Sequence, residues 1–215
     1  PPGAADPAAR SEPMTSVPRM MNSVITKMAK LARRQLAAQS PSAFASVYLG
    51  RHFLKARCAM HEALFRTLKS ASSTRGRRIA IAAPRGHAKS TIVSLAYPLW
   101  CLMNGLEPYI VLVSDTGPLA EHNLRNIRAE LESNDLLKHD FPELLCRRVK
   151  PCREGAIALP SGALIVAKGA GQGIRGTKNR SNRPSLILVD DLENREEVVE
   201  ELQRDKLRSY FFGTL

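Results

Sequence analysis

The feature that most constrains this chain is the stretch from Arg78 to Thr91, in which an apolar run passes through a short polar loop to a Lys-Ser pair. The run predicts a buried strand at 78–83, and the residues after the loop predict the start of a helix. A loop between a strand and a helix N-terminus directs backbone N–H groups at an anion, and the Lys-Ser pair adds a cation and a hydroxyl. The predicted phosphate-binding loop comprises Pro84, Arg85, Gly86, His87, Ala88, Lys89, Ser90 and Thr91.

This loop departs from the usual G-x-x-x-x-G-K-[ST] pattern. The two glycine positions are occupied by Ala83 and Ala88, so that only Gly86 can adopt a positive φ without steric cost. The loop taken alone is therefore a weak signal, and a nucleotide site requires a second motif.

The second motif is the apolar run 186–189 followed by Asp190 and Asp191. Four branched apolar residues are typical of a buried parallel strand, and ligands of open α/β sheets bind at the carboxyl ends of such strands. As a Walker B pattern, it assigns Asp190 to Mg²⁺ opposite Ser90 and Asp191 to the attacking water. Glu193 reaches further and is the alternative water-positioning acid. Either motif alone could be an ordinary strand with a polar turn, whereas both in this order predict a P-loop ATPase that uses ATP and Mg²⁺.

The composition fits one soluble domain. The 215 residues are 44% hydrophobic and contain no apolar run long enough to span a membrane. Residues 1–20 are rich in Pro and Ala and are expected to be disordered, which leaves 21–215 as the ATPase domain. The four cysteines lack zinc-binding spacing, which indicates a reduced, cytoplasmic setting.

The charge points to a polyanionic partner. A formal net charge of +12 favours nucleic acid, because neutralising phosphates releases counterions. Only 5% of the residues are aromatic, so backbone contacts to a duplex are favoured over stacking on single strands. A basic protein without such a partner is the plainer alternative.

Apolar strands and amphipathic helices alternate along the chain. Strands are predicted at 109–114 and in a hairpin at 156–167, and helices at 21–38, 90–104, 117–133 and 195–211. The expected fold class is α/β, a P-loop NTPase of the ASCE or RecA-like type with a mostly parallel central sheet flanked by helices.

The chain resembles the ATPase half of tailed-phage terminase large subunits at three places: the loop 84–91, the Gly-Ile-Arg-Gly segment at 173–176 and the acidic run 190–194. The resemblance runs from about Phe53 to the end of the chain. It implies ATP hydrolysis that drives double-stranded DNA into a procapsid, a homo-oligomeric ring, and contacts with a portal protein and a small terminase subunit. The nuclease domain of that family has no counterpart in these residues.

The resemblance also assigns residues. Arg85 stands four positions before Lys89, where the family carries an arginine, and is expected to contact the γ-phosphate. Arg175 matches the arginine ahead of the Walker B strand and is the expected finger, supplied to a neighbouring subunit. His61 lies roughly where relatives contact adenine. A helicase-like ATPase and a decayed, nucleic-acid-binding prophage remnant are the alternatives.

Overall fold

The computed structural model describes residues 16–145, 150–151, 155–173, 183–192 and 201–214. Its centre is a five-stranded sheet in the order β2-β3-β4-β1-β5. The strands are β1 (Tyr109–Ser114), β2 (Lys150–Pro151), β3 (Ala156–Ala158), β4 (Leu164–Gly169) and β5 (Leu186–Val189). β1 pairs in parallel with β4 and β5, and the short β2 and β3 add antiparallel pairs at one edge. The prediction of an α/β fold with parallel strands at its centre is confirmed.

Helices account for most of the rest. They are α1 (Ser16–Ala38), α2 (Pro41–Tyr48), η1 (Gly50–His52), α3 (Ala59–Ser72), η2 (Thr91–Ala96), α4 (Tyr97–Met103), α5 (Gly117–Ser133), α6 (Asp135–Asp140), α7 (Pro142–Leu145) and α9 (Glu201–Thr214). The strands at 109–114 and 186–189 and the helix at 117–133 form as predicted. Residues 16–20 were expected to be disordered and instead begin α1, whose apolar spacing extends through Met20 and Met21.

Side-chain alternation along β1 divides the core between the two faces of the sheet. Ile110 and Leu112 lie in the larger cluster, which includes the buried residues of η2, α4 and α5. Val111 and Val113 lie in a smaller cluster, against which Tyr210 of α9 packs. A strand with both faces buried needs apolar residues at every position, which explains the unbroken run of β1.

The hairpin predicted around residues 160–162 is also present. Leu159 N donates to Ala163 O at 2.9 Å, and Gly162 supplies a positive φ of 88° within the turn. This turn lets β3 pair antiparallel with β4.

The strand predicted at 78–83 is not formed. These residues have no secondary structure, and Ile79 is 41% exposed. No strand in the described part of the chain pairs with this segment, so its backbone groups lack the hydrogen bonds of a sheet. Its alternation of Ile and Ala also buries too little apolar area to hold it against the sheet without such pairing.

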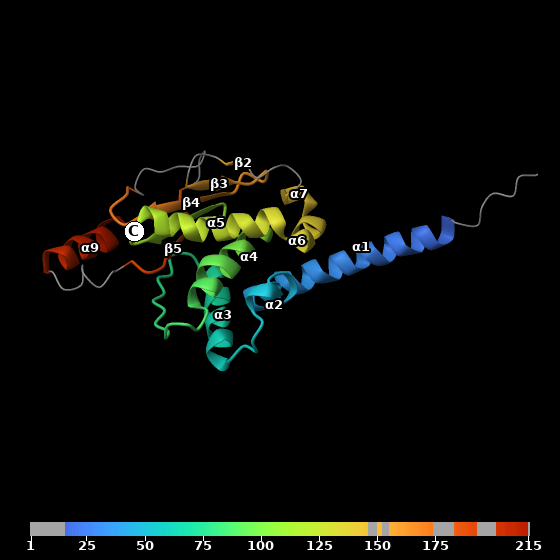
Figure 1. Ribbon diagram of the computed structural model, residues 1–215, viewed down its shortest axis with the longest axis horizontal. Helices are drawn as coiled ribbons and strands as arrows, with labels where there is room; N and C mark the ends of the chain where they lie inside the picture. The colour runs from blue at the N-terminus through green and yellow to red at the C-terminus, as the bar shows by residue number, and fades with distance from the viewer. Residues whose placement is uncertain (1–15, 146–149, 152–154, 174–182, 193–200, 215) are drawn as a thin grey trace, which may run out of the picture.

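α1 projects from the body of the molecule and is anchored only near its C-terminal end (Figure 1). There Arg33 donates two hydrogen bonds of 2.7 Å to the fully buried Asp140, and Tyr48 Oη donates a third at 3.0 Å.

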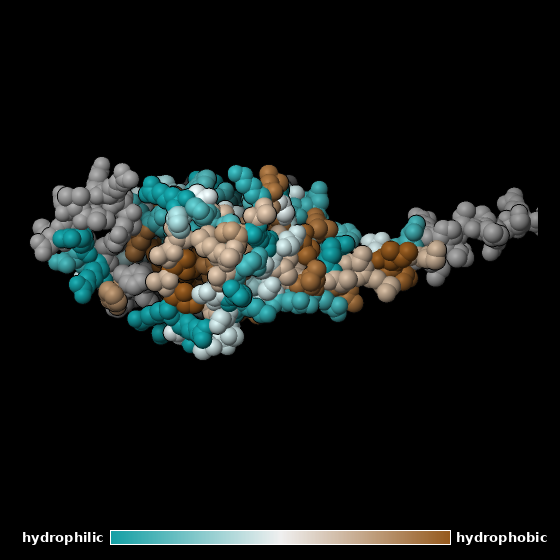
Figure 2. Space-filling view, turned by 90° about the horizontal axis from the view of Figure 1, so that it is seen from below, coloured by the Kyte–Doolittle hydropathy of each residue, from teal (hydrophilic) through white to brown (hydrophobic). Residues whose placement is uncertain are grey.

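Further out along α1, apolar residues are exposed and are visible as a brown patch (Figure 2). These residues are Met21, Val24, Ile25, Met28 and Leu31.

Candidate functional site

The two sequence motifs meet at the C-terminal edge of the parallel strands. Lys89 Nζ lies 3.8 Å from Asp190 Oδ1 and 3.8 Å from Asp191 Oδ1. Lys89 stands at the start of the helical segment that leads into η2, and both acids directly follow β5. The site residues predicted from two distant parts of the sequence are therefore neighbours in space.

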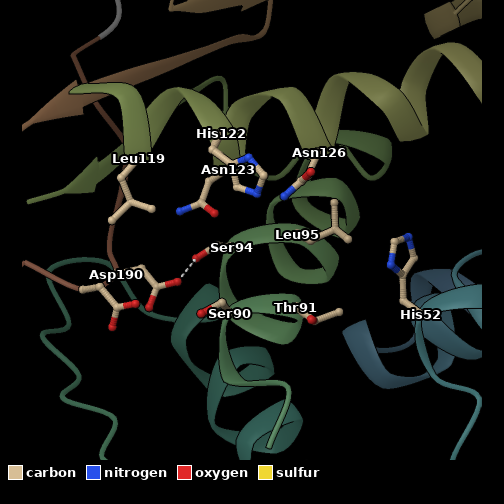
Figure 3. Close-up of a pocket in the computed structure, with 11 residues that line it drawn as sticks. His52, Ser90, Thr91, Ser94, Leu95, Leu119, His122, Asn123, Asn126 and Asp190 are labelled. Carbon is tan, nitrogen blue, oxygen red and sulfur yellow. Dashed lines mark hydrogen bonds between the residues drawn. The ribbon is translucent and has the colours of Figure 1, made fainter. Parts of the chain in front are cut away.

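Ser94 adds a contact that sequence reasoning missed. Its hydroxyl donates to Asp190 Oδ2 at 2.9 Å, and both side chains are buried (Figure 3). Ser94 lies one helical turn after Ser90, on the same side of the helix. A serine within an otherwise apolar segment was the signal that could have identified it.

A cleft of about 440 Å³ opens beside these residues. Ser90, Thr91 and Ser94 line one side of it, together with both acids. The opposite wall is the polar face of α5, and its side chains point toward the serines (Figure 3). They are His122, Asn123 and Asn126, with His52 closing one end. Sequence reasoning missed this wall because His and Asn on an amphipathic helix usually face solvent.

His52 is held in the cleft wall by a buried carboxylate. Its Nε2 lies 2.5 Å from Glu130 Oε1, and Arg51 and Asn134 also bind Glu130, which is 1% exposed. Burial raises the pKa of Glu130, but the hydrogen bonds from His52, Asn134 and Arg51 outweigh burial and hold the pKa below its usual value. Glu130 is therefore a charged anchor that fixes one end of α5 to η1.

The first part of the predicted loop, residues 84–89, does not line the cleft, whereas Ser90 and Thr91 do. Arg85, Gly86 and His87 are exposed, and none of them lines the cleft. His61 of α3 donates from Nε2 to His87 O at 3.1 Å, so that α3 supports the loop. The residue expected near an adenine therefore contacts the loop backbone.

Two non-glycine residues in the described chain have positive φ, and both belong to this site. Ala88 has a φ of 53° and Asp191 a φ of 47°. The turn at Asp191 directs its carbonyl to Asp115 N at 3.0 Å, beside the end of β1. Unfavourable backbone conformations of this kind gather at ligand sites, where surrounding structure maintains them.

Ser114 is a third feature that the sequence did not indicate. Asp190 N donates to Val113 O at 2.9 Å, which places Ser114 beside Asp190 along the sheet. The Ser114 side chain is fully buried, and its hydroxyl has no hydrogen-bond partner among the described residues. An unpaired buried hydroxyl costs stability, so its position next to Asp190 is of functional interest.

The donor set suits magnesium bound with a phosphate. No group of three or more His, Cys, Asp or Glu side chains that could hold a metal occurs in the described ranges. Magnesium is usually bound by one or two carboxylates together with water and substrate phosphates, and the Asp190 carboxylate and the Ser90 hydroxyl are the groups of this cleft that could take part in holding it. Two predicted site residues, Arg175 and Glu193, lie outside the described residues.

Comparison with known proteins adds no family to this geometry. No protein-family model, curated protein or solved structure matches the chain. Among the helices that the structure describes, none combines the length and apolar character needed to cross a bilayer.

Proposed function

We propose that this chain is the ATP-hydrolysing motor domain of a phage-type terminase large subunit, with a P-loop NTPase fold and ATP and Mg²⁺ as cofactors. One observation carries the proposal: the Lys89 ammonium lies between two carboxylates at the carboxyl end of parallel strands, at the start of a helix. Anionic ligands of α/β proteins bind at such an edge.

Each residue has a distinct task in this proposal. Lys89 exchanges its 3.8 Å carboxylate contacts for phosphate oxygens. Ser94 orients Asp190, which with Ser90 holds the metal. Asp191, or Glu193 beyond it, positions the attacking water. Bound magnesium would neutralise charge on the transferred phosphoryl group.

The motor assignment rests on the sequence resemblance and on charge. Arg85 is an exposed residue of the loop, and its proposed task is to contact the γ-phosphate. Arg175 is the proposed finger supplied to the neighbouring subunit of a homo-oligomeric ring. The net charge of +12 suits a double-stranded DNA substrate, and the portal protein and small terminase subunit are the proposed protein partners.

A decayed loop that binds nucleic acid without turnover is the second candidate. The φ of 53° at Ala88 favours it, because this is the position where the usual pattern has glycine. The presence of Lys89, Ser90 and Asp190 favours the active enzyme.

The test is ATP hydrolysis by Lys89→Ala protein. We expect hydrolysis to be abolished, because the substitution removes the cation that binds the β- and γ-phosphates. Lys138→Ala is the matched control, since Lys138 pairs with the exposed Asp135 on α6. Released phosphate is measured for both variants, with folding checked by circular dichroism. Hydrolysis by Lys89→Ala at the rate of Lys138→Ala would disprove the assignment.

A further inference from the structure

Residues 63–106 contain seven Lys and Arg residues and no Asp or Glu. These cations are Arg66, Lys69, Arg75, Arg77, Arg78, Arg85 and Lys89. Among these, Arg75 pairs with Glu107, and Lys89 contacts Asp190 and Asp191. The other cations of the stretch that the structure places on or after α3 have no carboxylate partner in the described ranges, so they produce a local positive potential.

Helix α3 presents part of this charge on one face. Arg66, Lys69, Ser70 and Ser73 follow the i, i+3, i+4, i+7 spacing of a single helical stripe, and all four are exposed. Neither Arg66 nor Lys69 has an ion pair within the described ranges. The opposite side of the helix packs into the core through Leu64, Phe65 and Leu68.

The turn after α3 returns two further cations to this stripe. Arg77 Nη1 donates to Ser70 O at 3.2 Å, which places its guanidinium over the last turn of α3. Arg75 Nη1 binds both oxygens of the buried Glu107 at 2.7 Å, yet 67% of the Arg75 side chain is exposed. Gly76, with a φ of 75°, permits the reversal between them. The turn is thus anchored at two points.

We propose that α3 and the turn 73–78 form the surface that binds the phosphate backbone of duplex DNA. The identity of the polymer rests on the proposed function, whereas the location rests on the contacts above. Lys, Arg and Ser side chains are the usual phosphate ligands of DNA-binding proteins. The aromatic residue of α3, Phe65, is buried, so bases of a single strand have no stacking platform on this helix.

This surface is joined to the candidate nucleotide site. His61 at the start of α3 donates to His87 O in the phosphate loop. Arg78 begins the segment that leads into the same loop. Duplex DNA on α3 would therefore contact the element that supports the loop.

The experiment compares two matched pairs of cations in the full chain. Arg66→Ala/Lys69→Ala removes two cations spaced i, i+3 on α3, and Lys27→Ala/Lys30→Ala removes two with the same spacing on α1. Binding of a fluorescein-labelled duplex of about 30 base pairs is followed by fluorescence anisotropy across a range of salt concentrations. The slope of log K against log salt is negative, and the α3 double substitution should make it less steep by about 1.8, the value for two lost phosphate contacts. The α1 pair should leave the slope at the wild-type value.

Charge-conserving Arg66→Lys/Lys69→Arg should retain the wild-type slope, which separates lost charge from damage to the helix. Equal effects of the α1 and α3 pairs would show binding by diffuse net charge and overturn the proposal. An unchanged slope for the α3 pair, or no measurable duplex binding by the wild-type chain, would also overturn it. The outcome is independent of catalysis, because Lys89→Ala tests hydrolysis alone.

Discussion

Two buried aspartates, Asp140 and Asp190, differ in how many protein groups bind their carboxylates. Asp140, which anchors α1, receives hydrogen bonds at 2.7 to 3.0 Å from Arg33, Tyr48 and His139. Among the described residues, the side chain of Asp190 in the candidate site receives one hydrogen bond, from Ser94, and a looser contact at 3.8 Å from Lys89. The first acid is fully satisfied by protein groups, whereas the second retains capacity for a ligand. The contacts of the two acids thus separate a structural role, for Asp140, from the ligand-binding role proposed for Asp190.

The largest expected effect is the loss of function in Asp190→Asn. Magnesium-dependent ATP hydrolysis should fall by more than roughly 100-fold, the upper range for groups that merely support a metal ligand. Stability should change by no more than about 1 kcal/mol, because an amide oxygen can still accept from Ser94. Turnover and urea denaturation measured on one preparation check both expectations. A large loss of stability with retained turnover would make Asp190 an anchor like Asp140.

The reverse result is expected for Asp140→Asn. Removing one partner of a buried ion pair should cost about 3 kcal/mol of folding free energy. Nucleotide affinity of the folded variant should be unchanged, because Asp140 lies in the α1 anchor and does not line the cleft. Denaturant titration and nucleotide titration measure the two quantities. A fall in both the nucleotide affinity and the stability of Asp140→Asn would contradict the separate roles proposed for Asp140 and Asp190.

The pH dependence of Asp140→Asn sharpens this result. Burial raises the pKa of Asp140, but hydrogen bonds from Arg33, His139 and Tyr48 outweigh burial and hold the pKa below its usual value. A carboxyl group with a lowered pKa contributes its full stability above the unfolded-state pKa of about 3.9. That contribution is lost as the pH falls through the folded-state pKa. The wild-type protein should therefore lose more stability below about pH 4 than Asp140→Asn does.

The features that could be predicted from the sequence are those that depend on a local pattern of residues. Continuous apolar runs located β1 and β5, and the two motifs together predicted that the loop and the acids after β5 belong to one site. The structure brings Lys89 and Asp190 within 3.8 Å of each other. Pattern could not decide 78–83, because a strand also needs a partner and this segment has none in the described chain. Ser94, Ser114 and the α5 wall were missed for a related reason. A buried hydroxyl or a polar helix face acquires meaning only from what tertiary structure places opposite it.

A smaller effect with a distinctive sign is expected at Ser114. Ser114→Ala removes a buried hydroxyl that has no partner among the described residues, so stability without nucleotide should rise by about 1 kcal/mol. If this hydroxyl supports Asp190 in the bound state, magnesium-dependent nucleotide affinity should fall severalfold.

Ser94→Ala is the matched control for Ser114→Ala. It makes the same atomic change at a hydroxyl that is hydrogen-bonded to Asp190, and it should lower stability by about 1 kcal/mol. Thermal melts with and without magnesium and nucleotide compare the two. A loss of stability in both variants would mean that the Ser114 hydroxyl makes a stabilising hydrogen bond, as the Ser94 hydroxyl does, and would contradict the prediction.

The smallest effect is expected from Ala88→Gly, which tests whether the unusual φ belongs to a working loop. A β-carbon at a φ of 53° costs about 1–2 kcal/mol, and the extra chain entropy of glycine offsets about 0.5–1 kcal/mol of the relief. Ala88→Gly should therefore raise stability by roughly 0.5–1 kcal/mol, whereas Ala63→Gly in α3 should lower it by about 1 kcal/mol. In a working loop the nucleotide affinity stays within a few-fold of wild type, because the loop already has its binding conformation. A gain in affinity of about tenfold would instead mean that part of the nucleotide binding energy is used to hold Ala88 at its unfavourable φ, as expected of a decayed loop.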